Sequence, residues 1–188
     1  AAAPTPAAAQ GKPDFSWEGA IPRGRWLYVR NLNGAIRVDR ASGDKASVTA
    51  EKRVRRGSGD DVRIEMRKVG NDDVLICAIW NDNTTCDADG YRTRGNDNWN
   101  RRNEVSVEFT IRLPEGVKLG TSSVNGGLHI EGATSEVEAS TVNGAISAVT
   151  SGGPVHASTV NGGIDVSMRD LGTEDLTFDT VNGSIELE

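Results

Sequence analysis

The side chains that could do chemistry in this sequence are few, and their spacing argues against catalysis. Asp165 and Glu186 each follow an Asn-Gly pair at the same offset, so they could form the two carboxylates that glycosidic hydrolysis requires. Ala145 and Ser147 fill the neighbouring outward positions, and the surrounding repeats offer no aromatic platform for a sugar ring. We therefore expect no catalytic residues, and a polysaccharide-acting enzyme is the weakest of three functional hypotheses.

Residues that could bind a metal ion are also poorly placed. His129 and His156 stand at different offsets from their Asn-Gly pairs, so we expect them on different sides of the molecule. The acidic loop around residues 82–97 lacks the full spacing of a calcium loop and its final bidentate glutamate. The sequence thus predicts no metal site and no cofactor.

Basic and aromatic side chains gather in one polar segment, residues 81–103, and next to it. Arginines there could contact an anionic glycan or lipid headgroups, and aromatic rings could stack on sugar rings. An ordinary solvated loop is the alternative. A net charge of −6 argues against nucleic acid as a partner. The candidate binding residues are Trp80, Tyr91, Arg92, Arg94, Trp99, Arg101 and Arg102.

Cys77 and Cys86 are the only cysteines of the chain, and a polar stretch separates them. Such a pair is typical of a disulfide formed in an oxidising compartment, and two free thiols are the alternative. A zinc site is disfavoured because the sequence has no second cysteine pair and no nearby histidine.

The elements that must position these side chains follow from a repeat. The phrase Val-Asn-Gly occurs four times after residue 118, with its Asn residues 18, 18 and 21 positions apart, and Leu32-Asn33-Gly34 resembles a fifth copy. This period predicts a single-stranded β-solenoid (a β-helix or β-roll) of 18–21-residue coils. We expect the Asn-Gly pairs to form the corners and to supply positive φ. The corner residues are Asn33, Gly34, Asn125, Gly126, Asn143, Gly144, Asn161, Gly162, Asn182 and Gly183.

Apolar residues alternate with polar ones within each repeat, as in a strand with one buried face. Leu128 and Ile130 should point inward with His129 outward, and we also expect Val142, Val160 and Val181 to be apolar inner positions. Two-residue hairpins are an alternative explanation of Asn-Gly pairs. The solenoid is favoured because only stacked corners require the same residue at a constant interval.

The preceding residues differ in pattern. Residues 1–20 are expected to be a disordered Ala/Pro-rich tether, residues 21–118 a β-rich region with hairpins, and residues 119–188 the solenoid. Strands are predicted at 46–52, 61–69, 74–80 and 104–113, with a hairpin turn at 70–73. Because open solenoid ends are prone to edge pairing, we expect this region to cap the coils.

Charge is distributed unevenly along the chain. Residues 119–188 hold ten acidic side chains and one basic one, whereas the remainder carries a net charge of +3. The asymmetry could mark a partner surface, or the two segments could simply be solvated independently. No apolar run approaches the ~20 residues needed to span a bilayer, so the sequence predicts no transmembrane segment.

The strand at 109–116, which ends in Leu-Pro-Glu-Gly, and the recurrent corners after it resemble a family of exported bacterial envelope proteins known as putative adhesins. The matching corners are residues 122–126, 140–144, 158–162 and 179–183, and the resemblance covers about residues 25–188. It implies an exported β-solenoid domain of the periplasm or cell surface, and it supplies no catalytic motif.

We therefore expect a non-enzymatic, adhesin-like binding module of the bacterial cell envelope, whose partner is a glycan or another cell-surface component. The alternative is a structural scaffold that assembles as a homo-oligomer through its solenoid edges.

Overall fold

The computed structural model describes residues 12–93 and 103–188. Within these ranges the chain forms seventeen β-strands and one short 3₁₀ helix, η1 (Gly59–Asp61), so the prediction of an all-β protein is confirmed. No helix in the described ranges has the length and apolar character needed to cross a membrane.

Nine strands precede the repeats. They are β1 (Phe15–Ala20), β2 (Trp26–Arg30), β3 (Ile36–Arg40), β4 (Lys45–Arg56), β5 (Arg63–Val69), β6 (Asp73–Ile79), β7 (Thr84–Asp87), β8 (Gly90–Thr93) and β9 (Glu104–Leu113). The four predicted strands correspond to β4, β5, β6 and β9, and the predicted turn at 70–73 joins β5 to β6. The expectation of disorder over residues 1–20 is wrong for β1, which pairs with β4 along its whole length. Residues 1–11 lie outside the described ranges.

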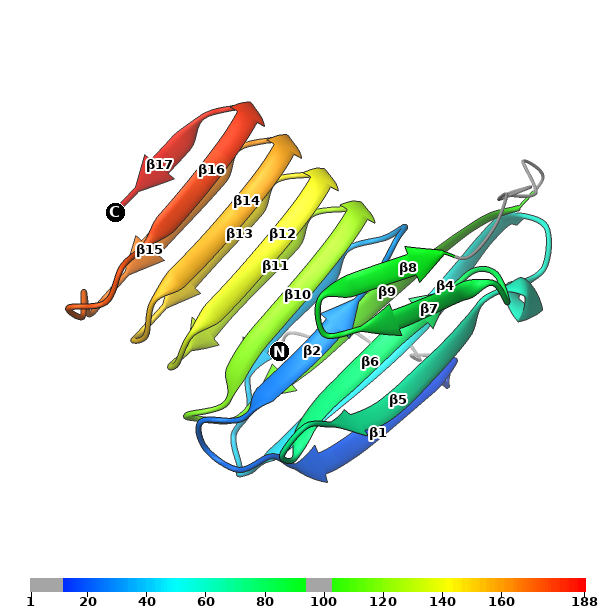
Figure 1. Cartoon of the computed structure of the whole chain (residues 1–188), viewed down its shortest axis with the longest axis horizontal. Coiled ribbons are helices and arrows are strands. Elements are labelled where there is room, and N and C mark those ends of the chain that lie inside the picture. Colours follow the sequence, from blue (N-terminus) through cyan, green and yellow to red (C-terminus); the bar gives the residue numbers. More distant parts are fainter. Residues whose placement is uncertain (1–11, 94–102) are drawn as a thin grey trace, which may run out of the picture.

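Eight strands form the repeats. They are β10 (Lys118–Asn125), β11 (Leu128–Ala133), β12 (Val137–Asn143), β13 (Ile146–Thr150), β14 (Val155–Asn161), β15 (Ile164–Met168), β16 (Thr177–Asn182) and β17 (Ile185–Leu187). Each repeat contributes one strand to each of two sheets that lie face to face (Figure 1).

The two large sheets run through the whole body. The seven-stranded sheet has the order β16-β14-β12-β10-β2-β6-β5, and the eight-stranded sheet has the order β1-β4-β9-β3-β11-β13-β15-β17. The predicted single-stranded solenoid is therefore not what the structure shows, because both sheets are multi-stranded and mix parallel with antiparallel pairs. The predicted cap also differs, since the N-terminal strands continue both sheets instead of covering their ends. The division at residue 118 stays a prediction.

The repeat interval fixes the register of the parallel strands. Leu119 pairs with Val137 and Val137 with Val155, each 18 residues on, while Ala157 pairs with Phe178 across the 21-residue interval. The extra residues of that interval lie between β15 and β16. Equivalent positions therefore stand in columns across the strands, about 4.8 Å apart.

The asparagines of the corners form one such column. Each side-chain amide donates a hydrogen bond to the side-chain oxygen of the preceding asparagine, at 2.8–2.9 Å, from Asn182 through Asn161, Asn143 and Asn125 to Asn33. The fifth copy of the phrase thus belongs to the same stack, although Asn33 precedes Asn125 by 92 residues.

The glycines of the corners are needed for a different reason from the one expected. Only Gly34 has a positive φ, so the expectation is wrong for Gly126, Gly144, Gly162 and Gly183. A Cβ atom at any of these four would instead collide with the backbone carbonyl of the equivalent glycine in the preceding repeat. Close stacking of successive corners therefore excludes every side chain.

One hydrophobic core extends from Ile21 to Val166 between the two sheets. Leu128 and Ile130 point into it, as predicted. Val142, Val160 and Val181 are exposed, which corrects the expectation, because strict alternation from Val137 places Thr141 inside and Val142 outside. Two of the buried hydroxyls form hydrogen bonds across the stack: Thr141 donates to Gly126 O and Thr159 to Gly144 O, both at 2.9 Å. The buried hydroxyls of Thr121 and Thr150 have no hydrogen-bond partner among the described residues.

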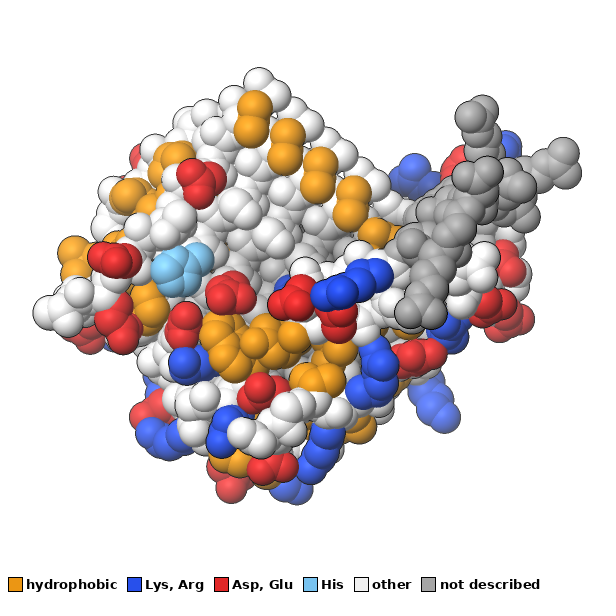
Figure 2. Space-filling view, viewed as in Figure 1, with side chains coloured by type: hydrophobic (Ala, Val, Ile, Leu, Met, Phe, Trp, Pro, Cys, Tyr) orange, Lys and Arg blue, Asp and Glu red, His pale blue; other side chains and the backbone are white. Residues whose placement is uncertain are grey.

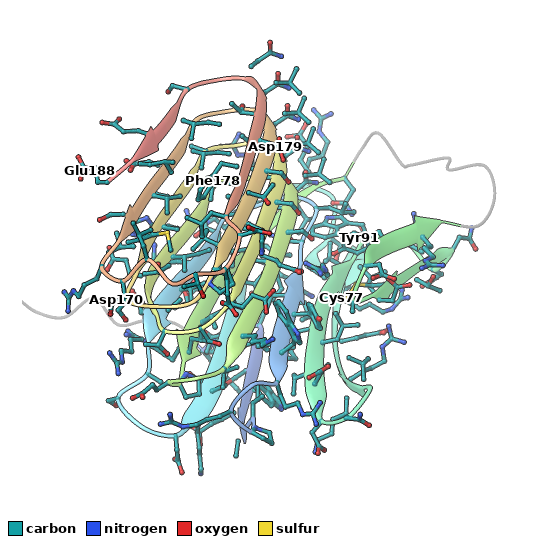
Figure 3. The ribbon with its side chains drawn as sticks, turned by 60° about the vertical axis from the view of Figure 1, so that its left-hand side comes forward. Cys77, Tyr91, Asp170, Phe178, Asp179 and Glu188 are labelled. Atoms are coloured by element: carbon teal, nitrogen blue, oxygen red, sulfur yellow. A yellow bond between two sulfur atoms is a disulfide. The ribbon has the colours of Figure 1, made fainter. Side chains whose placement is uncertain are left out.

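The predicted polar loop at 81–103 contains a two-stranded hairpin, β7–β8, which forms a separate small sheet. Cys77 of β6 and Cys86 of β7 form the predicted disulfide (Figure 3). Further hydrogen bonds run from Arg67 to the carbonyl of Cys86 and from Arg30 to the carbonyl of Ala88. These contacts hold the hairpin against the outer face of the seven-stranded sheet.

Candidate functional site

The structure describes three of the seven predicted binding residues, and each already has a partner within the fold. Arg92 forms ion pairs with Asp87 at 2.9 Å and with Asp89 at 3.5 Å. The Tyr91 hydroxyl donates to the Ala78 carbonyl at 2.6 Å, and the Trp80 ring nitrogen donates to the Val105 carbonyl at 3.2 Å. Arg94, Trp99, Arg101 and Arg102 lie outside the described residues.

The residues considered for hydrolysis lie on the outer face of the eight-stranded sheet. Asp165 and Glu186 are paired on adjacent strands, as their offsets predict, and both are exposed. His129 lies 3.0 Å from Glu131, whereas His156 lies on the other sheet. Within the described ranges, no cluster of three histidine, cysteine or acidic side chains could hold a metal ion.

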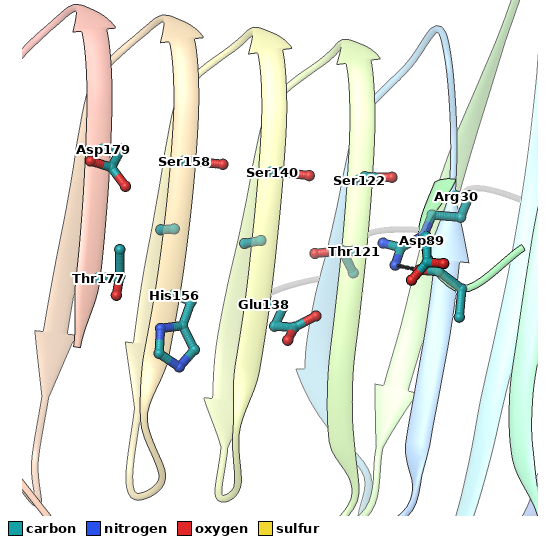
Figure 4. Close-up of a pocket in the computed structure, with 13 residues that line it drawn as sticks. Arg30, Asp89, Thr121, Ser122, Glu138, Ser140, His156, Ser158, Thr177 and Asp179 are labelled. Carbon is teal, nitrogen blue, oxygen red and sulfur yellow. Dashed lines mark hydrogen bonds between the residues drawn. The ribbon is translucent and has the colours of Figure 1, made fainter. Parts of the chain in front are cut away.

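A groove of about 480 Å³ opens on the outer face of the seven-stranded sheet (Figure 4). Its floor crosses β10, β12, β14 and β16, and residues of the β7–β8 turn lie at one end. The side chains that define it are Arg30, Asp89, Ser122, Glu138, Ser140, His156, Ser158, Thr177 and Asp179. We call it the outer-face groove.

The repeat explains why this face is hollow. Outward positions form columns, and one column runs through Ser122, Ser140, Ser158 and Asp179. The next column holds Glu138, His156 and Thr177. Small serine side chains at three successive strands leave room above the sheet, and their hydroxyls can both donate and accept hydrogen bonds. A ligand lying across the strands would meet the same group at every strand.

Arg30 is the unusual residue of the groove because its guanidinium is almost fully buried, with 6% of the residue exposed. It lies 5.2 Å from the ring centre of Tyr28 and donates to Ala88 O, but its Nε has no hydrogen-bond partner in the described part of the chain. Burial lowers the pKa of Arg30, while the carboxylates of Glu138 and Asp89 act in the opposite direction. A buried donor without a partner is costly, so Arg30 is held at this position at a cost in stability.

On β2, an aromatic row continues from Arg30. Trp26 and Tyr28 are stacked with ring centres 5.2 Å apart, and the Lys118 ammonium lies 5.3 Å from the Trp26 ring. Burial, followed by the charge of Glu138, raises the pKa of Tyr28 to about 12. The ring of Tyr28 covers Gly120, where a Cβ atom would collide with it.

Arg30 and its neighbours Trp26 and Tyr28 were not singled out from the sequence. Trp26, Tyr28 and Arg30 alternate with Leu27 and Val29, and this period of two was the available signal for a shared face. Their proximity to Glu138 depends on the pairing of β2 with β10, which joins segments about 90 residues apart and leaves no local pattern.

A second feature of this face is an apolar row beside the asparagine column. It consists of Val124, Val142, Val160 and Val181, and Figure 2 shows hydrophobic side chains in a row along this part of the surface. The exposed fraction is 38–39% at Val142 and Val160 and 73% at Val181. The face therefore combines apolar, hydroxyl and charged columns in parallel.

Together these features define an elongated all-β protein built of two facing sheets with stacked corners. No protein-family model matches the chain, and no curated protein matches it. Among solved structures, it is similar to a crystal structure of a putative cell adhesion protein from Clostridium sporogenes, with a TM-score of 0.54 and 11% sequence identity. That similarity covers 94% of this chain and 99% of the other, and at this identity it shows a shared fold.

Proposed function

We propose that this protein is an exported, non-enzymatic, adhesin-like module that binds a cell-surface glycan in the outer-face groove. The observation that carries the proposal is the groove itself, which presents a column of serine hydroxyls at the strand spacing beside the buried Arg30. The cell adhesion protein with the same fold supports the adhesin-like role, and the Cys77–Cys86 disulfide supports export.

The charges of the groove narrow the class of glycan. Asp89, Glu138 and Asp179 contribute three carboxylates, against the single guanidinium of Arg30. A densely anionic polymer would be repelled by these acids, whereas neutral or amine-bearing sugars would find acceptors for their hydroxyl and ammonium groups. We therefore favour a neutral or amino-sugar polymer that lies across the strands.

A non-enzymatic role fits the placement of the acidic residues. Asp165 and Glu186 are exposed on the outer face of the other sheet, away from the groove. Catalytic carboxylates are commonly placed in enclosed sites that exclude water and hold the substrate. Turnover of a polysaccharide that is abolished by Asp165→Ala would contradict this part of the proposal.

A glycan array with matched variants tests the site. Ser140→Trp places an indole in the groove, and Ser147→Trp makes the same change on the outer face of the other sheet. We expect Ser140→Trp to lose binding at least tenfold while Ser147→Trp retains it. Equal binding by both variants would remove the groove from the proposal, and absence of binding to any glycan would contradict the glycan partner.

A third variant tests the surface favoured by the sequence alone. Replacing Arg92, Arg94, Arg101 and Arg102 with serine leaves the serine column unchanged. Binding that survives this replacement but not Ser140→Trp assigns recognition to the groove. The opposite result assigns recognition to the arginine-rich segment.

A further inference from the structure

Both large sheets end at the same two ends of the body. One end, which we call the tail, consists of β16 and β17, and the other, the head, consists of β1, β5 and residues 51–56 of β4 (Figure 1). β1 pairs with β4 only as far as Ala50, so residues 51–56 of β4 have no paired strand on that side among the described residues; the Lys52 N–H alone is capped there, by the Asp14 carboxylate at 2.7 Å. Unpaired strand edges are templates for pairing with another chain.

The tail exposes positions that are buried everywhere else in the stack. Ile185 and Leu187 are 42% and 55% exposed, whereas their partners on β15, Ile164 and Val166, are at most 1% exposed. Leu176 is 38% exposed, and Phe178 is only partly buried. The last repeat therefore leaves the end of the core open.

The head offers a matching apolar strip. Phe15 and Trp17 of β1 and Ile64 of β5 are partly buried against the end of the core, and Met66 of β5 is 38% exposed. These side chains come from both sheets, as the apolar residues of the tail do. Contact between head and tail would bury apolar surface on both sides.

The two ends carry opposite charge. Residues 164–188 hold seven acidic side chains and one basic one, Arg169. At the head, residues 51–56 and β5 together hold seven basic and two acidic side chains. None of the ion pairs among the described residues involves Arg55, Arg56 or Lys68. The head thus has cations available for the acidic tail, and two tails brought together would repel each other.

We propose that the tail of one copy binds the head of a second copy, so that β16 pairs with β5 and β17 pairs with β1 of the neighbour. Both sheets run from an edge strand at the head to an edge strand at the tail. A second copy displaced along the stacking direction therefore continues both sheets at once. The β16–β5 pair would be antiparallel, since β5 alone in its sheet opposes the other strands. Such a head-to-tail contact does not close on itself and produces open chains of molecules.

Complementary blocked variants test this contact. Ile185→Lys with Leu187→Lys blocks the tail, and Arg55→Glu with Lys68→Glu blocks the head; all four residues are exposed in the monomer, so folding should survive. Arg37→Glu with Arg112→Glu makes the same charge change in the middle of the eight-stranded sheet. Circular dichroism checks the fold of each variant, and sedimentation over a range of concentrations measures assembly.

We expect the wild type and the mid-sheet control to grow beyond dimers as concentration rises, with growth weakened by high salt. Each blocked variant alone should remain monomeric, and an equal mixture of the two should stop at a one-to-one dimer. A wild type that stays monomeric would overturn the proposal. Dimers that the head-blocked variant still forms alone would also overturn it, because they would show a two-fold tail-to-tail contact.

Discussion

The stacked corners make a quantitative prediction for a single methyl group. In Gly144→Ala the new Cβ would collide with the carbonyl group of Gly126 and lie 2.9 Å from the Gly127 nitrogen, all of them backbone atoms that cannot rotate away. The neighbouring position supplies the control: Gly163 has its nearest atom, the Ser184 carbonyl oxygen, at 3.5 Å, and two other repeats carry Ala145 and Ser184 at the equivalent position.

The expected magnitude follows from overpacking and from the hydrogen bonds that a shift would strain. Overpacking a close-packed site costs about 1–3 kcal/mol. Separating the two corners would also lengthen the bond from Thr141 Oγ1 to Gly126 O and that from Gly126 N to Asn143 O, each worth about 1 kcal/mol. We expect Gly144→Ala to lower the free energy of unfolding by about 3–5 kcal/mol and Tm by roughly 6–20 °C.

Urea denaturation with the disulfide intact, followed by circular dichroism, measures both variants under the same conditions. Gly163→Ala should be neutral or more stable by about 0.4–1 kcal/mol, because alanine restricts the unfolded chain. If Gly144→Ala is as stable as Gly163→Ala, the corners do not approach each other as closely as described, and the explanation of the invariant glycine in the repeat is wrong.

Three further results are expected. Asn161→Leu removes two hydrogen bonds of the asparagine column and should lower stability by about 1–2 kcal/mol in urea denaturation; no loss would show that the column is dispensable. Replacing Cys77 and Cys86 together with serine should cost about 2–3 kcal/mol and speed amide hydrogen exchange in the β7–β8 hairpin, whereas unchanged exchange would argue against its tethering role. Burial raises the pKa of Tyr28 to about 12 and raises the pKa of Tyr91, the only other tyrosine, so no phenolate absorbance should develop in the native protein at pH 10. The unfolded chain loses these protons first, so stability should fall as pH rises from about 10 towards 12, and native ionisation at pH 10 would contradict the assignment.

Much of the stack could be predicted because its determinants are local and repeated. The constant interval between asparagines predicted which residues stand side by side, and alternation predicted the inward positions of Leu128 and Ile130. The same alternation, followed from Val137, would have placed Val142 outside. The expectation for Val142 was wrong because it followed the apolar character of valine. The two-residue period of the strand decides which face a side chain occupies, and it places Val142 outside.

The reason for the corner glycines could not be found by considering one turn alone. An isolated Asn-Gly pair indicates positive φ, but the constraint at Gly144 comes from the backbone of another repeat. Likewise, the pairing of β2 with β10 and of β3 with β9 depends on tertiary packing, so the sequence showed strands without showing that they extend two common sheets.

The outer-face groove was missed for a related reason. Single repeats contain only an ordinary serine or glutamate at the outward positions, and the hollow forms when several such positions are stacked. The sequence favoured instead the arginines and aromatic residues near the cysteines. Those that the structure describes, Trp80, Tyr91 and Arg92, already have hydrogen-bond or ion-pair partners.

The stacked asparagine column is the feature on which the columns, the groove and the open ends all depend, and nuclear magnetic resonance can detect it directly. In the ¹⁵N-labelled protein, the side-chain amide protons of Asn143 should show nuclear Overhauser contacts to Asn125 and Asn161 and slow exchange with solvent. Rapidly exchanging side-chain amides without these contacts would contradict the stacked column. Contacts typical of antiparallel hairpins between consecutive strands would show that the repeats have a different fold.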